Sequence, residues 1–431
     1  MKYTLRILLV CISFLCIHSL YAQDFKTLIA EAEEAYQAKN HKIAGEIYLK
    51  AFALKEFQNI DKGDLYNAAC VFALQNGKEQ AFDLLQKAIE AGWRDIAWMQ
   101  KDGDLKVLRG ETQWGELLQK AQKKIAEFEA SLKYPRLRVE LLQMKEEDQR
   151  HRRLMVQLQA DRKKNAAKIE KLISTLTDLD TKHTARMEEV VLKIGWPKIS
   201  DVGEDGSNAA WVLVQHADKR PDFQNKCLDL LKEAINAQEA KSSNYAYLYD
   251  RVQVAYSDKQ VYATQTQRNS LTNQLEFIPI KNEHEVNQKR QEMGLSDILG
   301  YAKRIGIDYK ILSEAEAQAK ANTQENEYIQ LTAKGEISYE DGEYENAQRF
   351  YRRMMQLNGN IETDDIYRAA CAASLSAKEK QSTFYFLNKA ILKGWNDLPK
   401  LQSEKAFENL HGSPEWLQLV GILKAAKKTE K

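Results

Sequence analysis

Apolar residues recur at helical spacing through the first third of the chain. Between residues 25 and 130, small and aliphatic side chains return every three or four positions, as at Leu84, Leu85 and Ala88. This period predicts amphipathic helices, and small residues at recurring positions let paired helices approach each other closely. We therefore predict a lobe of packed helix pairs over residues 23–130.

The same pattern returns near the other end of the chain. Five features recur there in the same order, with equal spacing inside each block and shifts of one or two residues between blocks. They are a tyrosine pair, a Tyr-x-Ala-Ala-Cys motif, a Lys-Ala-Ile segment, a Gly-Trp pair and a second tryptophan. The counterparts are Tyr36 and Tyr339, Tyr48 and Tyr351, Tyr66 and Tyr367, Cys70 and Cys371, Lys87 and Lys389, Trp93 and Trp395, and Trp114 and Trp416. So many linked matches predict an internal duplication, with a second lobe over residues 325–427. We interpret the shared residues as packing residues.

The centre of the chain, residues 135–312, predicts a third and mainly helical domain. No glycine or proline interrupts residues 137–194, so we expect an α-helical hairpin or one long strut that ends at Gly195. A polar loop is predicted over residues 201–207, with Asn208 capping a helix over residues 209–217. Further helices are predicted over residues 222–237, from Ser242 and over residues 290–312, and extended segments over residues 260–265 and 277–280. The predicted fold class is mainly all-α.

Residues 1–22 have the three parts of a secretory signal peptide. Lys2 and Arg6 form a basic start, an apolar stretch follows from Ile7 to Leu20, and Ala22 precedes the expected cleavage point. This apolar stretch is shorter than the roughly 20 residues that a membrane-spanning helix needs. We therefore expect an exported protein, periplasmic or extracellular, without stable membrane insertion.

Charge and cysteine content exclude several classes of protein. The chain has 63 basic and 62 acidic residues, for a formal net charge of +1. Such a balance has no basic footprint for nucleic acid. Cys70, Cys227 and Cys371 form no CxxC pair and lie in apolar helical contexts, so we expect buried free thiols.

Known catalytic motifs are missing from the sequence, which has no P-loop, dinucleotide-binding glycine motif, HExxH or GxSxG. We accordingly expect neither a metal nor a cofactor. Polar residues instead gather in the centre, among aromatic and aliphatic neighbours. The catalytic candidates are His216, Asp218 and Asp250, and the ligand-binding candidates are Asp148, Gln149, Arg152, Gln215, Arg251, Tyr262, Thr264 and Gln265.

Two interpretations of these polar residues stay open. In the first, they line a cleft in which His216 and a carboxylate transfer protons while Arg152 or Arg251 holds an anion. In the second, they form a satisfied network that fixes how the helices cross. Either way, we expect His216, Asp250, Arg251 and their polar neighbours to converge on one cluster, because unpaired buried polar groups are costly.

Ordered motifs in the centre resemble a bacterial family catalogued as a domain of unknown function. They are Asp148-Gln149-x-x-Arg152, Gly195-Trp196-Pro197, Leu213-Val214-Gln215-His216-Ala217-Asp218, Asp250-Arg251-Val252 and Gln260-x-Tyr262-x-Thr264-Gln265. The resemblance covers about Leu137 to Leu312 and implies no activity. The family pattern has glycine where this chain has Ala263. The spacing around Asn40 resembles a tetratricopeptide unit, which implies helix-pair scaffolds that often bind proteins.

Three functions are compatible with these patterns. The first is an exported interaction protein that binds a protein or small ligand through its helical lobes and central polar residues. The second is a hydrolase-type enzyme that uses His216 with Asp218 or Asp250. The third is a structural component of the cell envelope. A pocket lined by His216 would favour the enzyme, and a filled core either of the others.

Overall fold

A computed structural model describes residues 25–56, 59–257, 259–357, 361–376 and 380–429. These residues are mainly helical, and their only sheet has two short strands. The predicted mainly all-α class is confirmed. By its contacts the chain divides into two compact units, Met1–Leu132 and Lys133–Lys431.

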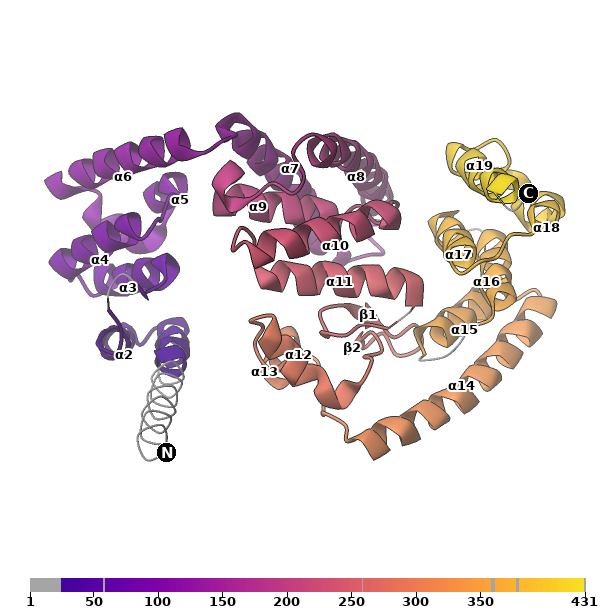
Figure 1. Cartoon of the computed structure of the whole chain (residues 1–431). Helices are drawn as coiled ribbons and strands as arrows, with labels where there is room; N and C mark the ends of the chain where they lie inside the picture. Colours follow the sequence, from indigo (N-terminus) through magenta and orange to yellow (C-terminus); the bar gives the residue numbers. More distant parts are fainter. Residues whose placement is uncertain (1–24, 57–58, 258, 358–360, 377–379, 430–431) are drawn as a thin grey trace, which may run out of the picture. The chain divides into compact units, whose positions relative to one another are not determined.

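The first unit is a lobe of paired helices around one apolar core (Figure 1). After a helix over residues 25–37, it contains α2 (His41–Phe52), α3 (Lys62–Leu74), α4 (Lys78–Glu90), α5 (Ile96–Lys101), the 3-10 helix η2 (Gly103–Leu108) and α6 (Thr112–Ser131). In the core of this lobe Tyr66 stacks on Trp93, with ring centroids 3.9 Å apart and planes 9° from parallel. Gly92, at φ 100°, makes the turn that delivers Trp93 to this stack.

The second unit begins with five helices that pack around a core of their own. They are α7 (Pro135–Gln159), α8 (Ala166–Ile194), α9 (Ile199–Gln215), α10 (Pro221–Asn236) and α11 (Ser242–Ser257). Helices α7 and α8 form the predicted hairpin, with Pro135 in the first turn of α7 and Gly195 directly after α8. Trp196, 2% exposed, is among the core residues that follow.

The prediction of a polar loop over residues 201–207 was wrong, because these residues belong to α9. Gly203, at φ 77° and ψ 165°, has non-helical backbone, so α9 consists of two helical segments that meet at a kink there. Asp201 accepts a hydrogen bond from the backbone N–H of Lys198 and so caps the first turn. Asn208 therefore lies inside α9 instead of capping it.

Beyond α11 the chain forms a small hairpin and three short helices. These are β1 (Thr266–Arg268), β2 (Leu275–Phe277), the 3-10 helix η3 (Glu283–Glu285), α12 (Val286–Glu292) and α13 (Ile298–Ile305). The strands are antiparallel, with Gln267 opposite Glu276. Residues 290–312, predicted to be helical, contain the end of α12 and the whole of α13. Gly294, at φ 68°, lies between these helices, and Gly306 follows α13.

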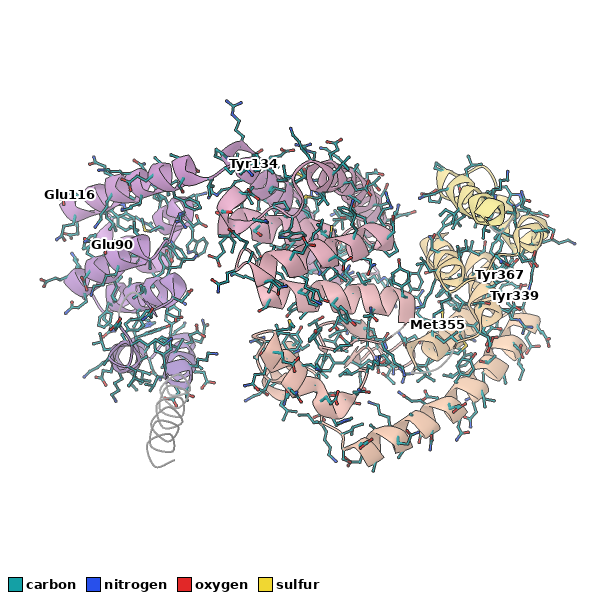
Figure 2. All side chains as sticks on the ribbon, in the orientation of Figure 1. Glu90, Glu116, Tyr134, Tyr339, Met355 and Tyr367 are labelled. Atoms are coloured by element: carbon teal, nitrogen blue, oxygen red, sulfur yellow. The ribbon has the colours of Figure 1, made fainter. Side chains whose placement is uncertain are left out.

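The last part of the second unit repeats the element order of the first lobe. It contains α14 (Glu314–Glu340), α15 (Tyr344–Gln356), α16 (Thr363–Leu375), α17 (Lys380–Leu392), α18 (Leu398–Ser403), the 3-10 helix η4 (Lys405–Leu410) and α19 (Pro414–Thr429). Tyr367 stacks on Trp395 at 4.5 Å and 17°, and Gly394 has φ 101°. Figure 2 shows side chains filling the space between these helices, with Met355 and Tyr367 labelled.

This C-terminal lobe packs against the small hairpin. Arg353 of α15 pairs with Glu276 of β2 at 2.7 Å, and its guanidinium also reaches Glu327 of α14. Gln356 donates to the backbone oxygen of Arg268 at 2.8 Å. These polar contacts attach α15 to both strands and place the lobe beside the central domain.

The expected signal peptide lies outside the described residues. Within the described ranges, none of the helices is both long and apolar enough to cross a membrane. Cys70, Cys227 and Cys371 are all buried and unbridged.

Two helical glycines of the C-terminal lobe make opposite predictions. A Cβ on Gly335 would lie 2.8 Å from the ring of Tyr351, whereas a Cβ on Gly421 would meet nothing within 4 Å. We expect Gly335→Ala to lower the free energy of unfolding by about 1–3 kcal/mol, because the close approach of α14 and α15 would be lost. The control Gly421→Ala should raise it by about 0.5–1 kcal/mol, because alanine favours helix. Urea denaturation measures both, and equal effects would contradict the packing.

Candidate functional site

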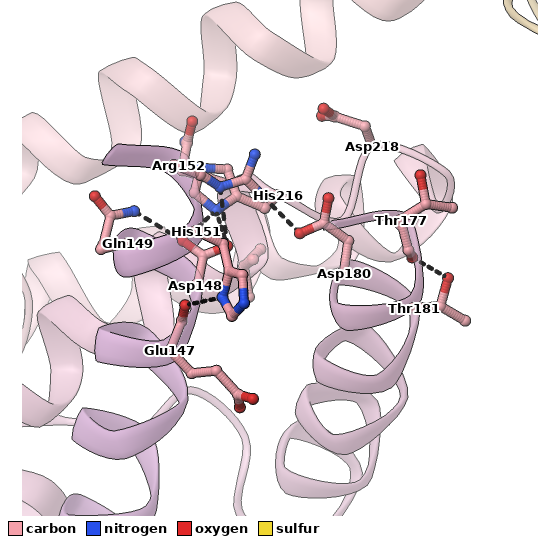
Figure 3. Close-up of polar contacts among 12 residues, drawn as sticks. Glu147, Asp148, Gln149, His151, Arg152, Thr177, Asp180, Thr181, His216 and Asp218 are labelled. Atoms are coloured by element: carbon pink, nitrogen blue, oxygen red, sulfur yellow. Dashed lines mark hydrogen bonds and ion pairs between the residues drawn. The ribbon is translucent and has the colours of Figure 1, made fainter. Parts of the chain in front are cut away.

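His216 lies where α9 ends and faces the α7–α8 hairpin (Figure 3). Its Nδ1 is 3.1 Å from Oδ1 of Asp148 on α7 and 3.0 Å from Oδ2. The His216 side chain is 17% exposed and that of Asp148 is 1% exposed. A buried carboxylate therefore orients a partly exposed imidazole.

Asp148 receives two further hydrogen bonds from its own helix. Arg152 Nε donates to Oδ1 at 2.9 Å, and Gln149 Nε2 donates to Oδ2 at 2.8 Å. Burial on its own would raise the pKa of Asp148, but the hydrogen bond and charge of His216 and the charge of Arg152 outweigh it and lower the pKa. Asp148 is thus held as an anion.

Asp180 on α8 completes this group, which we call the His216 network (Asp148, Arg152, Asp180 and His216). Arg152 Nη2 donates to Asp180 Oδ1, so one guanidinium bridges the carboxylates of two helices. Burial raises the pKa of Asp180 to about 6, although the charges of Arg152 and His216 oppose the rise. The network therefore contains two carboxylates, one permanent cation and one imidazole.

Beside the network, Arg251 of α11 forms a bidentate ion pair with Asp218. Both Arg251–Asp218 hydrogen bonds are 2.6 Å long, and the Asp218 side chain is 59% exposed. Asp218 therefore has its own partner, and the carboxylate on His216 is that of Asp148. Nδ1 is committed to Asp148, which leaves Nε2 to accept or donate a proton.

Asp250 organises a second network on another side of α11. Its side chain is fully buried and accepts from the backbone N–H groups of Val261, Tyr262 and Thr264 at 2.7, 3.0 and 3.0 Å. The Thr264 hydroxyl donates to the same carboxylate at 2.9 Å. Burial raises the pKa of Asp250, and these hydrogen bonds oppose the rise.

Arg290 of α12 holds the same loop by its carbonyl groups. Its Nη1 donates to the backbone oxygens of Tyr262 at 2.6 Å and Ala263 at 3.2 Å, and the residue is 1% exposed. The loop is therefore held between an anion that takes its N–H groups and a cation that takes its C=O groups. We call Asp250, Arg290 and the loop Gln260–Gln265 the loop clamp.

The backbone of Ala263 makes this arrangement possible. Ala263 has φ 52°, a left-handed conformation that is uncommon outside glycine. In this conformation Ala263 turns the chain between Tyr262 and Thr264, whose N–H groups both reach Asp250. The residue type at this position differs from the family pattern, yet its backbone has the conformation that glycine favours.

The predicted polar residues thus belong to different groups instead of one cluster. Asp148, Gln149, Arg152 and His216 meet in the His216 network, whereas Asp250, Tyr262, Thr264 and Gln265 belong to the loop clamp. Gln215 joins neither group, because its side-chain oxygen accepts from the backbone N–H of Leu248 and from the indole of Trp211.

Sequence reasoning missed Asp180, His183 and Arg290. Asp180 and His183 lie in the long charged stretch of α8, where the sequence does not show which face meets α7. His183 is 3% exposed, and neither of its ring nitrogens has a hydrogen-bond partner among the described residues. Burial lowers its pKa, although Glu147 and Asp148 oppose this.

Comparison with known families finds a match that contains the site but assigns no reaction to it. Residues 135–312 match the model of a family described as a family of unknown function (DUF6624). A search of curated proteins finds no match to this chain. The family match spans the five helices, the hairpin and both networks, and it confirms the resemblance of the centre to a family of unknown function.

The two networks predict different costs for removing a carboxylate. Asp250→Asn should lower the free energy of unfolding by about 2–4 kcal/mol, because a neutral amide would face three backbone donors in a buried site. Asp218→Asn should cost less than about 1 kcal/mol, because the Asp218–Arg251 pair is solvated. Chemical denaturation monitored by circular dichroism compares the two, and a larger loss for Asp218→Asn would contradict the assignment.

Proposed function

We propose that this protein is an exported binding protein that holds an extended peptide between its central domain and its C-terminal lobe. One observation carries the proposal: an open groove of about 660 Å³ runs along strand β2. Its walls are Gln274–Lys281, the segment Ile307–Tyr309, the first turns of α14, and Arg353 and Gln356 of α15. We call it the junction groove.

The edge of β2 in the groove has unused hydrogen-bonding groups. Asn269 N donates to the backbone oxygen of Gln274, and Ile278 N donates to that of Gln265. Even-numbered residues of β2 therefore face β1, and Leu275 and Phe277 face away from it. By the alternation of an antiparallel ladder, the backbone N–H and C=O of Leu275 and Phe277 point away from β1.

Such an edge can bind a peptide as an additional strand. The main chain would supply up to four hydrogen bonds, from two N–H and two C=O groups of Leu275 and Phe277. The groove carries both signs of charge and has aliphatic side chains at Ile278 and Ile280. These features suit a polar, extended segment with an occasional apolar side chain.

The lobes support a binding role in a second way. The C-terminal lobe holds the groove wall in place through Arg353 and Gln356, so its helices act as a scaffold. The resemblance to tetratricopeptide units points the same way, and we include the common origin of the two lobes in the proposal. Neither the junction groove nor the neighbouring cavity of about 510 Å³ is lined by His216.

The test selects peptides from a random phage-displayed library on the purified protein and measures their affinities by fluorescence polarisation. Leu275→Pro should weaken the selected peptides at least tenfold, because it removes an N–H that folding does not use and adds bulk at the edge. Leu275→Ala is the matched control, since it loses the side chain and keeps the N–H. Peptides that bind both variants equally, or a failure to select any peptide, would contradict the proposal.

A further inference from the structure

The His216 network contains three metal-ligating side chains from three different segments. Asp148 on α7, Asp180 on α8 and His216 at the end of α9 each direct one donor atom to a common region (Figure 3). These donor atoms all lie within 4.8 Å of one another. Ligand atoms about 2.0–2.2 Å from one metal lie roughly 3–4 Å apart, so the widest separation in the set would have to shorten by about 1–2 Å.

Charge in the network favours a cation. Asp148, Asp180 and the adjacent Asp218 carry three negative charges, and Arg152 and Arg251 carry two positive charges. A metal ion binds a neutral imidazole, and the remaining charges then leave an excess of one negative charge. Arg251 is engaged by Asp218, so Arg152 alone bridges Asp148 and Asp180.

Arg152 occupies the position that a metal ion would take. Its guanidinium contacts the same two carboxylates as the metal would, and its side chain is 31% exposed. Arginine on a helix surface can turn its head group to solvent while its aliphatic part stays packed. Displacing Arg152 would free both carboxylates, and His216 is already aligned with Asp148.

The buried His183 is a second and independent observation at this place. It follows Asp180 by three residues and so lies on the same face of α8. Its Nε2 is 3.6 Å from Glu147 Oε2, and neither ring nitrogen has a hydrogen-bond partner among the residues described. The buried imidazole of His183 therefore adds a further ligand-type side chain to the face of α8 that carries Asp180.

Another group of ligand-type side chains, Cys70, Asp102 and Asp104 in the first lobe, is different. Asp102 accepts from Tyr66 at 2.8 Å, and Asp104 accepts from Tyr36. The Cys70 thiol also lies against Asp102. Burial raises the pKa of the Cys70 thiol, which disfavours the thiolate that a metal ion needs, whereas Asp148 in the His216 network is an anion.

We propose that Asp148, Asp180 and His216 bind one divalent transition-metal ion, with Arg152 as an internal cation that the metal displaces. One imidazole and two carboxylates suit Zn²⁺ or Mn²⁺ better than Ca²⁺ or Mg²⁺, which take oxygen ligands. Three protein ligands leave further positions open for water or an anionic group. The site is separate from the junction groove, so either proposal can fail alone.

The test titrates ZnCl₂ and MnCl₂ into the chelator-treated full chain at pH 7.5 by isothermal titration calorimetry. One ion should bind per chain. Asp180→Asn and His216→Gln should each weaken it at least tenfold, and circular dichroism checks that they stay folded. Arg152→Gln should strengthen binding severalfold, because it removes the competing cation. A merely structural role for Arg152 would not produce this increase.

Asp104→Ala is the matched control, and it should leave the metal affinity unchanged. Co²⁺ substitution supplies a spectroscopic check, because binding to Cys70 would produce a thiolate charge-transfer band that the proposed site lacks. The proposal is overturned if no ion binds at 1:1, if Asp180→Asn and His216→Gln bind as tightly as the parent, or if Asp104→Ala abolishes binding.

Discussion

The central domain depends on how the buried charges Asp250 and Arg290 share one short loop. Asp250 takes N–H groups of the loop and Arg290 takes its C=O groups, so peptide dipoles between them separate the charges. This arrangement fixes the loop between α11 and β1. Strand β1 follows this loop and pairs with β2, so the wall of the junction groove depends on the side chains of Asp250 and Arg290. Neither side chain contacts a ligand in either proposal.

Much of the fold follows from local patterns in the sequence. The α7–α8 hairpin begins at Pro135 and ends before Gly195. Proline favours the first turn of a helix and glycine favours its end, and both preferences act within a few residues. The stretch before Asn208 misled the prediction, because glycine, aspartate and serine are typical of loops. Gly203 absorbs a kink inside α9, and tertiary packing of the surrounding turns outweighs weak helix propensity.

The site was less predictable, because it depends on which helix faces meet. Adjacent residues on a helix point in different directions, so the side chains of Asp250 and Arg251 must diverge. That divergence places Asp250 in the loop clamp and Arg251 in its ion pair with Asp218, whereas the sequence alone suggested one cluster. Asp180 could not be predicted for a related reason. Its partner, Arg152, lies on the other helix of the hairpin and donates a hydrogen bond across it. Spacing within one helix contains no information about such a contact.

The three buried thiols have a consequence for the refolding of the molecule. Burial raises the pKa of Cys227 and Cys371 to about 12, and it also raises that of Cys70, so all three are unreactive while the fold is intact. Unfolding would expose all three at once, and their odd number leaves one thiol unmatched for any intramolecular pairing. In air, an unfolded chain would therefore be trapped by mispaired or intermolecular disulfides. Denaturation would then be reversible only in the presence of a reductant.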